Sequence, residues 1–285
     1  MLILLTNDDG IYAPGLAAFE HELRRLGDVV VVAPAKEQSG VGHSITYLTP
    51  LIVKEVYRNG SNDVRWGWAV EGSPADCVKL GIQVFCPRTP DLVVSGINGG
   101  LNAGINVLYS GTVAAAVEGA FFGVTSVAVS LEFDEHARFA DAARLACNVI
   151  RQVLDKKGAA PELFNVNIPT AALRGTPEVC VVPMNVTRYG DTYQKRSDPW
   201  GRDYYWLMGG PPAPTAGETD LSALDKGKVT ITPLDYDLTR RSALAQMANW
   251  QFDLPEPADA PAAEATPAFA SPIRVVRKKK KEKTQ

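Results

Sequence analysis

The stretch LILLTNDDG, residues 2–10, joins an apolar run to two adjacent carboxylates and a turn glycine. An unbroken apolar run is typical of a strand covered on both faces, as in a parallel sheet. Ligands of open parallel sheets bind beyond the carboxyl ends of the strands, where Asp8 and Asp9 are predicted to lie. Two like charges at one place repel unless a cation lies between them, and their hard oxygens suit Mg²⁺, Mn²⁺ or Ca²⁺. The alternative is that Asp-Asp-Gly forms only a polar turn.

Composition is that of an ordinary globular protein, with 46% apolar and 21% charged residues among 285. No apolar run approaches the roughly 20 residues of a membrane span, and the N-terminus lacks a signal-peptide pattern. The four cysteines stand singly in apolar surroundings, at positions 77, 86, 147 and 180. They are expected to be reduced core residues, so the predicted location is the cytoplasm and no membrane partner is expected.

Charge is distributed unevenly along the chain. Residues 274–285 carry seven basic side chains and one acidic one, so the formal charge of −3 combines a tail of +6 with a body of −9. An acidic body argues against a general nucleic-acid surface. The basic tail could touch nucleic acid or acidic lipid, but such runs are usually solvated. No specific nucleic-acid partner is therefore predicted.

Alternating strand and helix patterns predict an α/β fold, a Rossmann-like three-layer α/β/α sandwich with a mainly parallel sheet. Strands are expected at 2–6, 29–33, 91–95, 126–130 and 163–168, with a hairpin or edge at 51–57 and 64–70. Helices are expected at 14–26, 73–84, 112–123 and 137–154. The core is expected to span about 1–170 of a single domain ending at 254. A smaller β-rich region at 171–254 would carry strands at 179–183, 203–207 and 229–231, and the Pro/Ala-rich and Lys-rich residues 255–285 are predicted to be disordered.

Polar loops follow several of the apolar strands. They contain, in chain order, Asn7 with Asp8 and Asp9, then Gln38-Ser39-Gly40, then Ser95, Asn98 and Ser110-Gly111-Thr112. Because the carboxyl ends of parallel strands lie at one edge of the sheet, these residues are expected to meet.

Ser110-Gly111-Thr112 precedes a helix of small residues, and its free backbone N–H groups would form an anion site. The alternatives are that Thr112 is only a helix cap and Asn98 only a turn residue, and that His43 merely adds polarity to its loop. A cation on two carboxylates opposite an anion cradle would suit phosphomonoester hydrolysis, because the metal activates water and the cradle accepts developing charge.

Several segments of the chain resemble motifs of the SurE family, a group of 5′/3′-nucleotidases. They are LLTNDDG at 4–10, APG at 13–15, AP at 33–34, QSG at 38–40, GSPADCV at 72–78, PDLVVSGIN at 90–98, YSGTV at 109–113, NVNIP at 165–169 and ITPL at 231–234. They stand in family order across about residues 1–240, and so many short motifs in register are very specific.

The resemblance implies a metal-dependent 5′-nucleotidase that acts on nucleoside monophosphates. Metal ligands would be Asp8, Asp9, Ser39 and Asn98, holding one divalent ion per subunit, Mg²⁺ or Mn²⁺. Asp8, Asp9 and Asn98 would be catalytic, and the phosphate would contact Asn98, Ser110, Gly111 and Thr112. The resemblance also implies a homodimer or homotetramer with exchanged C-terminal segments. The extension beyond about Leu254 departs from the usual family ending.

Three alternatives compete with this hypothesis. A response-regulator receiver also has an acid pair after its first strand, but needs an aspartate near residues 95–98, where the chain reads Ser-Gly-Ile-Asn. A phosphatase with a covalent phosphoaspartate would need a second acid two positions after the first. Two positions after Asp8 the chain has Gly10 instead. A nucleotide or sugar-phosphate binding module without turnover stays open, because binding and hydrolysis use the same anion cradle.

Overall fold

The computed structural model describes residues 1–58, 64–210 and 217–254. Its central sheet has nine strands in the order β3-β4-β2-β1-β5-β6-β7-β11-β8. The bounds are β1 Leu2–Thr6, β2 Asp28–Pro34, β3 Val53–Tyr57, β4 Arg65–Val70, β5 Leu92–Gly99, β6 Thr125–Leu131, β7 Leu163–Ile168, β8 Val179–Val181 and β11 Val229–Leu234. β2, β1, β5, β6 and β7 run parallel, which confirms the predicted α/β class.

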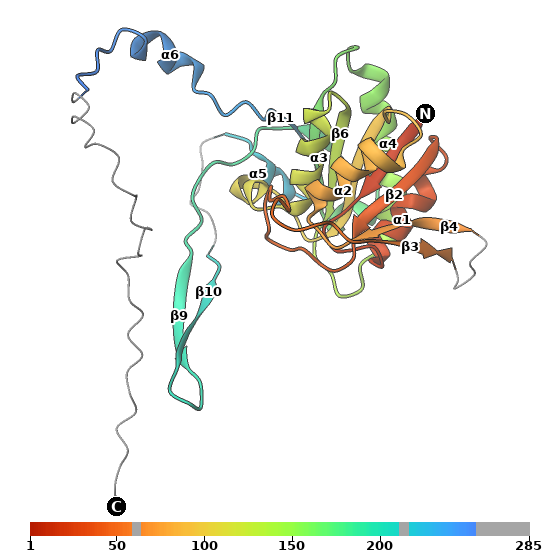
Figure 1. Ribbon diagram of the computed structural model, residues 1–285, viewed down its shortest axis with the longest axis horizontal. Coiled ribbons are helices and arrows are strands. Elements are labelled where there is room, and N and C mark those ends of the chain that lie inside the picture. The colour runs from red at the N-terminus through yellow and green to blue at the C-terminus, as the bar shows by residue number, and fades with distance from the viewer. Residues whose placement is uncertain (59–63, 211–216, 255–285) are drawn as a thin grey trace, which may run out of the picture. The chain divides into compact units, whose positions relative to one another are not determined.

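Helices cover both faces of this sheet (Figure 1). α1 (Pro14–Leu23) and α4 (Phe139–Lys156) pack on one face, and α2 (Pro74–Leu80) and α3 (Gly111–Phe121) on the other. β1 is buried along its whole length because helices lie above and below it. Its alternate side chains belong to different clusters, Ile3 to the α1 and α4 side and Leu4 to the α2 side.

Local sequence explains where the central helices begin. Ser73 and Asp76 form a reciprocal capping box at α2, in which each side chain accepts a hydrogen bond from the other residue's main-chain N–H. Pro74 at the first helical position needs no N–H partner. Ser110 caps α3 by accepting a hydrogen bond from Val113 N at 3.1 Å.

The region after Pro169 differs in part from the prediction. β11 pairs antiparallel with β7, and β8 pairs parallel with β11, so both strands extend the central sheet. A separate antiparallel ladder is formed by β9 (Thr192–Ser197) and β10 (Asp203–Met208) (Figure 1). The sequence patterns missed β9 and the short helices α5 (Asp220–Leu224) and α6 (Arg241–Met247).

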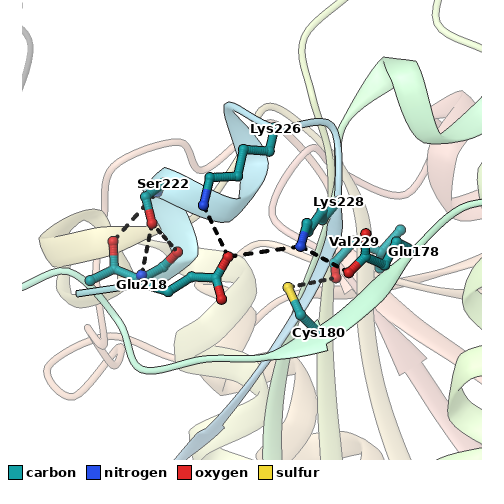
Figure 2. A network of polar contacts seen from close by, with 8 residues as sticks. Glu178, Cys180, Glu218, Ser222, Lys226, Lys228 and Val229 are labelled. Carbon is teal, nitrogen blue, oxygen red and sulfur yellow. Dashed lines mark hydrogen bonds and ion pairs between the residues drawn. The ribbon is translucent and has the colours of Figure 1, made fainter.

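A network of charged side chains links the residues on either side of α5 with Lys228, just before β11, and Glu178, just before β8 (Figure 2). Lys228 Nζ lies 2.8 Å from Glu178 Oε1 and 3.9 Å from Glu218 Oε1. Lys226 Nζ lies 3.2 Å from the same Glu218 oxygen. Both glutamates are well exposed, so these ion pairs add little stability.

The chain forms two compact units, one spanning Met1–Asp237 and a second that begins at Leu238. The first unit contains the sheet and the loops described below, and the second contains α6. The predicted disordered tail, 255–285, lies outside the described residues. Among the helices within the described ranges, none combines the length and the apolar character needed to cross a membrane.

Candidate active site

The candidate site lies where the strand order reverses. β1 has β2 on one side and β5 on the other. The chain first builds the sheet outward from β1 through β2, and later returns to the other side of β1 with β5. Loops at such a switch point diverge and leave a crevice outside the carboxyl ends of the strands. Asp8 and Asp9 follow β1, and Asn98 lies near the end of β5.

The two carboxylates of the acid pair make different contacts. Asp8 is only 4% exposed, and its Oδ1 accepts a hydrogen bond from Thr112 Oγ1 at 2.5 Å. Asp9 is half-buried, and its Oδ2 accepts one from the main-chain N–H of Gly99 at 3.2 Å. The pair therefore connects β1 with the start of α3 and with the end of β5.

Burial makes the ionised form of both carboxylates costly. It raises the pKa of Asp8 to about 6, an effect that the Thr112 hydroxyl opposes and the neighbouring charge of Asp9 reinforces. Burial also raises the pKa of Asp9, to which the Glu37 carboxylate adds repulsion. A bound cation would offset both costs, so the acid pair has the electrostatics of a metal site.

The neutral oxygens predicted as ligands come from the adjoining loops. Asn98 Nδ2 donates to Gly100 O at 2.6 Å, while its Oδ1 accepts no hydrogen bond from the described residues. Gln38 N donates to the main-chain oxygen of Asp8 at 2.8 Å, which brings the loop of Ser39 to the acid pair. The Ser39 hydroxyl itself donates to Glu37 Oε1 at 2.6 Å.

The donor set fits a hard divalent ion. Within the described residues there is no group of three or more His, Cys, Asp and Glu side chains that could hold a metal. Two carboxylates with a free amide oxygen and a hydroxyl are the mixed oxygen set that Mg²⁺ and Mn²⁺ prefer. Asn7 Oδ1, next in the chain to Asp8, is buried and accepts no hydrogen bond from the described part of the chain. Main-chain hydrogen bonds thus bring the Gln38–Ser39 loop and the end of β5 to the acid pair.

The predicted phosphate cradle lies directly against Asp8. A Cβ added at Gly111 would come 2.8 Å from Asp8 Cβ and 3.1 Å from Pro74 Cγ, so only glycine fits between β1 and α2. Thr112 is fully buried, and both its hydroxyl and its main chain make hydrogen bonds that lower the pKa of Asp8. Thr112 is therefore oriented toward the carboxylate, a contact that its sequence position alone did not reveal.

Two further residues of the site region were missed or undervalued in the sequence. Glu37 affects Asp9 and Ser39, although it is only one of several polar residues in its loop. His43 had no identified partner in the sequence, but its Nε2 lies 2.7 Å from Glu118 Oε2 in α3. Glu118 also pairs with Lys79 at 3.1 Å, so His43 fastens the loop of Ser39 to α3.

Comparison with known proteins gives consistent matches. The family model described as Survival protein SurE matches residues 3–196. The chain is 60% identical over 254 residues to the 5′-nucleotidase SurE of Rhodopirellula baltica, covering 88% of this chain and 99% of that protein. It is 43% identical over 258 residues to the 5′-nucleotidase SurE of Desulforudis audaxviator, covering 89% and 98%.

A solved structure agrees with these sequence matches. The crystal structure of the SurE protein from Aquifex aeolicus superposes with a TM-score of 0.75 at 37% identity. The match covers 87% of this chain and 98% of the Aquifex chain.

Proposed function

The chain belongs to the SurE family, and on that premise we propose that it is a 5′-nucleotidase, a metal-dependent phosphatase that converts nucleoside 5′-monophosphates to nucleoside and phosphate. Two curated relatives at 60% and 43% identity carry the name 5′-nucleotidase. The observation that carries the assignment is the 2.5 Å contact between Asp8 and Thr112, which joins the acid pair to the anion cradle. Hydrolysis of 3′-monophosphates is a second activity that we propose for the same site.

We assign one divalent ion per subunit, Mg²⁺ or Mn²⁺, to Asp8, Asp9, Ser39 and Asn98. Bound there, such an ion polarises phosphoryl oxygens and lowers the pKa of water near the phosphate. The support is the raised pKa of both carboxylates and the free Oδ1 of Asn98.

The chain's own residues would bind and orient the phosphate. Ser110, Gly111 and Thr112 lie at the start of α3, where main-chain N–H groups and the helix dipole favour an anion. The missing side chain of Gly111 would let the phosphate approach the backbone, and Asn98 would contact the same group from β5. Thr112 holds Asp8 in place by donating a hydrogen bond from its hydroxyl to Asp8 Oδ1. Water would then attack phosphorus without a covalent intermediate.

Phosphate release from a panel of nucleoside 5′- and 3′-monophosphates and sugar phosphates tests this function. We expect 5′-nucleotides to be hydrolysed, EDTA to abolish the activity, and added Mg²⁺ or Mn²⁺ to restore it. Full activity in EDTA would contradict the metal assignment. Binding of nucleotides without phosphate release would favour a binding module, and beryllofluoride trapped on an aspartate would favour a covalent mechanism.

We further propose that the protein forms a homodimer or homotetramer through the ladder of β9 and β10. Every residue of these two strands is exposed, and they include Tyr193, Tyr205, Trp206 and Leu207. An isolated two-stranded ladder is marginally stable in water, and an exposed aromatic surface of this kind suits a subunit contact. Location in the cytoplasm stays a prediction from the singly spaced cysteines.

A further inference from the structure

Three buried asparagines lie beside the candidate active site and have no role in the function proposed above. Asn165 and Asn167 belong to β7, within the NVNIP segment, and are fully buried. Asn102, in the glycine-rich loop after β5, is 9% exposed. Buried amides must form hydrogen bonds to offset lost hydration, so their partners indicate what they hold in place.

Asn167 and Asn165 bind the main chain of Asn102. Asn102 N donates to Asn167 Oδ1 at 2.9 Å, and Asn167 Nδ2 donates to Asn102 O at 3.1 Å. Asn165 Nδ2 donates to the same carbonyl oxygen at 2.7 Å. The side-chain amide of Asn167 supplies the acceptor and the donor from two separate atoms, Oδ1 and Nδ2. The peptide of Asn102 is thus fixed to the central sheet by three hydrogen bonds.

Asn165 is poorly explained by stability alone. Its Oδ1 is buried and accepts no hydrogen bond from the described residues. A buried amide oxygen without a donor costs free energy, and an apolar residue at this position would avoid that cost. What asparagine adds at position 165 is the hydrogen bond to Asn102.

The Asn102 side chain in turn meets Thr112. Its Nδ2 donates to Ser130 Oγ at 2.9 Å and lies 3.5 Å from Thr112 Oγ1. An amide nitrogen can donate but cannot accept, whereas a hydroxyl has a single proton. Because Asn102 Nδ2 donates toward Thr112 Oγ1, the hydroxyl proton of Thr112 cannot point toward Asn102. The proton therefore points to Asp8 Oδ1, which accepts it.

We propose that Asn102 is a positioning residue that turns the Thr112 hydroxyl toward Asp8, and that Asn165 and Asn167 hold Asn102 for this purpose. The inference rests on the proposed function, because it assigns Asn102 a part in ordering the metal and phosphate site. Removing a residue that hydrogen-bonds to a metal ligand commonly lowers metal affinity or activity by about 10–100-fold.

The test compares Asn102→Ala with Asn106→Ala in the full chain. Asn102→Ala removes only the side chain and leaves the main-chain hydrogen bonds to β7 in place. Asn106 is the matched control, because it is an exposed asparagine of the same loop. We expect Asn102→Ala to lower kcat for a nucleoside 5′-monophosphate by about 10-fold with KM changed by less than about 3-fold. Mn²⁺ titrated into EDTA-treated, desalted protein should bind about 10-fold more weakly, and Asn106→Ala should match wild type in both measurements.

A double-mutant cycle separates positioning from simple structural support. If Asn102 acts through Thr112, then Asn102→Ala in a Thr112→Val background should cause no further loss of kcat or Mn²⁺ affinity. Fully additive losses would overturn the inference. Should Asn102→Ala not fold, Asn102→Ser replaces it, because the shorter hydroxyl cannot reach Thr112.

The outcomes also separate this inference from the proposed function. Wild-type protein that binds Mn²⁺ but releases no phosphate would overturn the function, and the Mn²⁺ affinity of Asn102→Ala would still decide the role of Asn102. Folded Asn102→Ala with kcat and Mn²⁺ affinity within about 2-fold of wild type would overturn the inference alone. Wild-type protein that binds neither Mn²⁺ nor Mg²⁺ would overturn both.

Discussion

At the scale of single residues, the site combines a buried charge with the contacts that hold it. Asp8 is almost completely buried, yet its neighbours offset only part of the cost of its negative charge. Residues kept in unfavourable surroundings are common at functional sites, because the cost is recovered when a ligand binds. Asp8 therefore has a stronger functional signature in the structure than in the sequence.

Replacing Asp8 by asparagine should remove activity while preserving the fold. The amide of the Asp8→Asn variant keeps an acceptor for the Thr112 hydroxyl but lacks the charge that would bind a cation. We expect phosphate release to fall on the order of 10²-fold or more, with an unchanged far-UV circular dichroism spectrum. Asp155→Asn, at an exposed acid of α4, is the control and should keep full activity. An active Asp8→Asn enzyme would contradict the assignment of Asp8.

The same substitution should change the pH dependence of stability in EDTA-treated protein. Folding raises the pKa of Asp8 from 3.8 to about 6, so the folded state retains a proton that the unfolded state releases between these values. Stability from this group is therefore lost as pH rises through that window. We expect Asp8→Asn and wild type to be about equally stable near pH 4, and the variant to be about 2–3 kcal/mol more stable at pH 7. Urea unfolding at both pH values measures the difference, and a pH-independent difference would contradict it.

At the scale of elements, the site depends on how closely α3 approaches β1 and α2. Gly111 is the contact point, because a Cβ there would overlap Asp8 and press on Pro74. Alanine normally favours a helix over glycine, but here the helix start would have to move away from β1. At position 111, close packing against Asp8 and Pro74 thus requires glycine in place of a residue with higher helix propensity.

Gly111→Ala should therefore impair catalysis more than it affects folding. We expect phosphate release to fall by about 10²-fold, the scale of losing one preorganised donor, because both Asp8 and the cradle are displaced. Gly158→Ala is the control, since a Cβ there meets no atom within 4 Å. Steady-state kinetics of both variants test this, and equal activities would show that α3 can shift without disturbing the site.

At the scale of the whole molecule, the proposed subunit contact is argued from exposed aromatic surface. In the β9–β10 ladder, Trp206 is 57% exposed and Tyr193 is 69% exposed. Monomeric proteins usually bury most of the surface of such large aromatic side chains. The matches cover 99% of the Rhodopirellula baltica relative and 98% of the Desulforudis audaxviator relative. The same matches cover only 88% and 89% of this chain. Part of this chain therefore has no counterpart in those relatives.

Trp206→Glu should weaken subunit association. A charge placed in an aromatic contact has to be desolvated, so we expect light scattering after gel filtration to show a smaller species at micromolar concentration. Phe133→Glu is the control, because Phe133 is 73% exposed and lies outside the ladder. An unchanged mass for Trp206→Glu would exclude the ladder as a subunit contact.

Deleting residues 255–285 should leave turnover within about 2-fold of the full chain. Their Pro/Ala-rich and Lys-rich composition offers little apolar surface to bury in a packed core. Phosphate release by the chain ending at residue 254 tests this. A large loss would show that the tail belongs to the active assembly.

Local sequence determined the elements and the chemistry of this protein. An unbroken apolar run predicted β1 with its observed bounds, and Ser73 marked the start of α2, because strand burial and helix capping depend on neighbouring residues. β7 was predicted with its observed bounds from the alternation of strands and helices, although it contains Asn165 and Asn167. The helix expected from residue 112 begins at Gly111, and Ser110 rather than Thr112 is its cap. The acid pair after the first strand predicted a metal site at this edge of the sheet, and that assignment stays a prediction. Residues in motifs that resemble a known family then supplied the reaction.

Only the tertiary structure decided which distant residues meet. The contact of Asp8 with Thr112 spans 104 positions and that of Asn102 with Asn167 spans 65, distances at which no local pattern acts. β11 also joins the central sheet beside β7, and β8 joins it beside β11, because strand pairing depends on the neighbouring strand as well as on the strand's own sequence. Residue identities set what the site can do, and packing across the chain sets which oxygens lie close enough to do it.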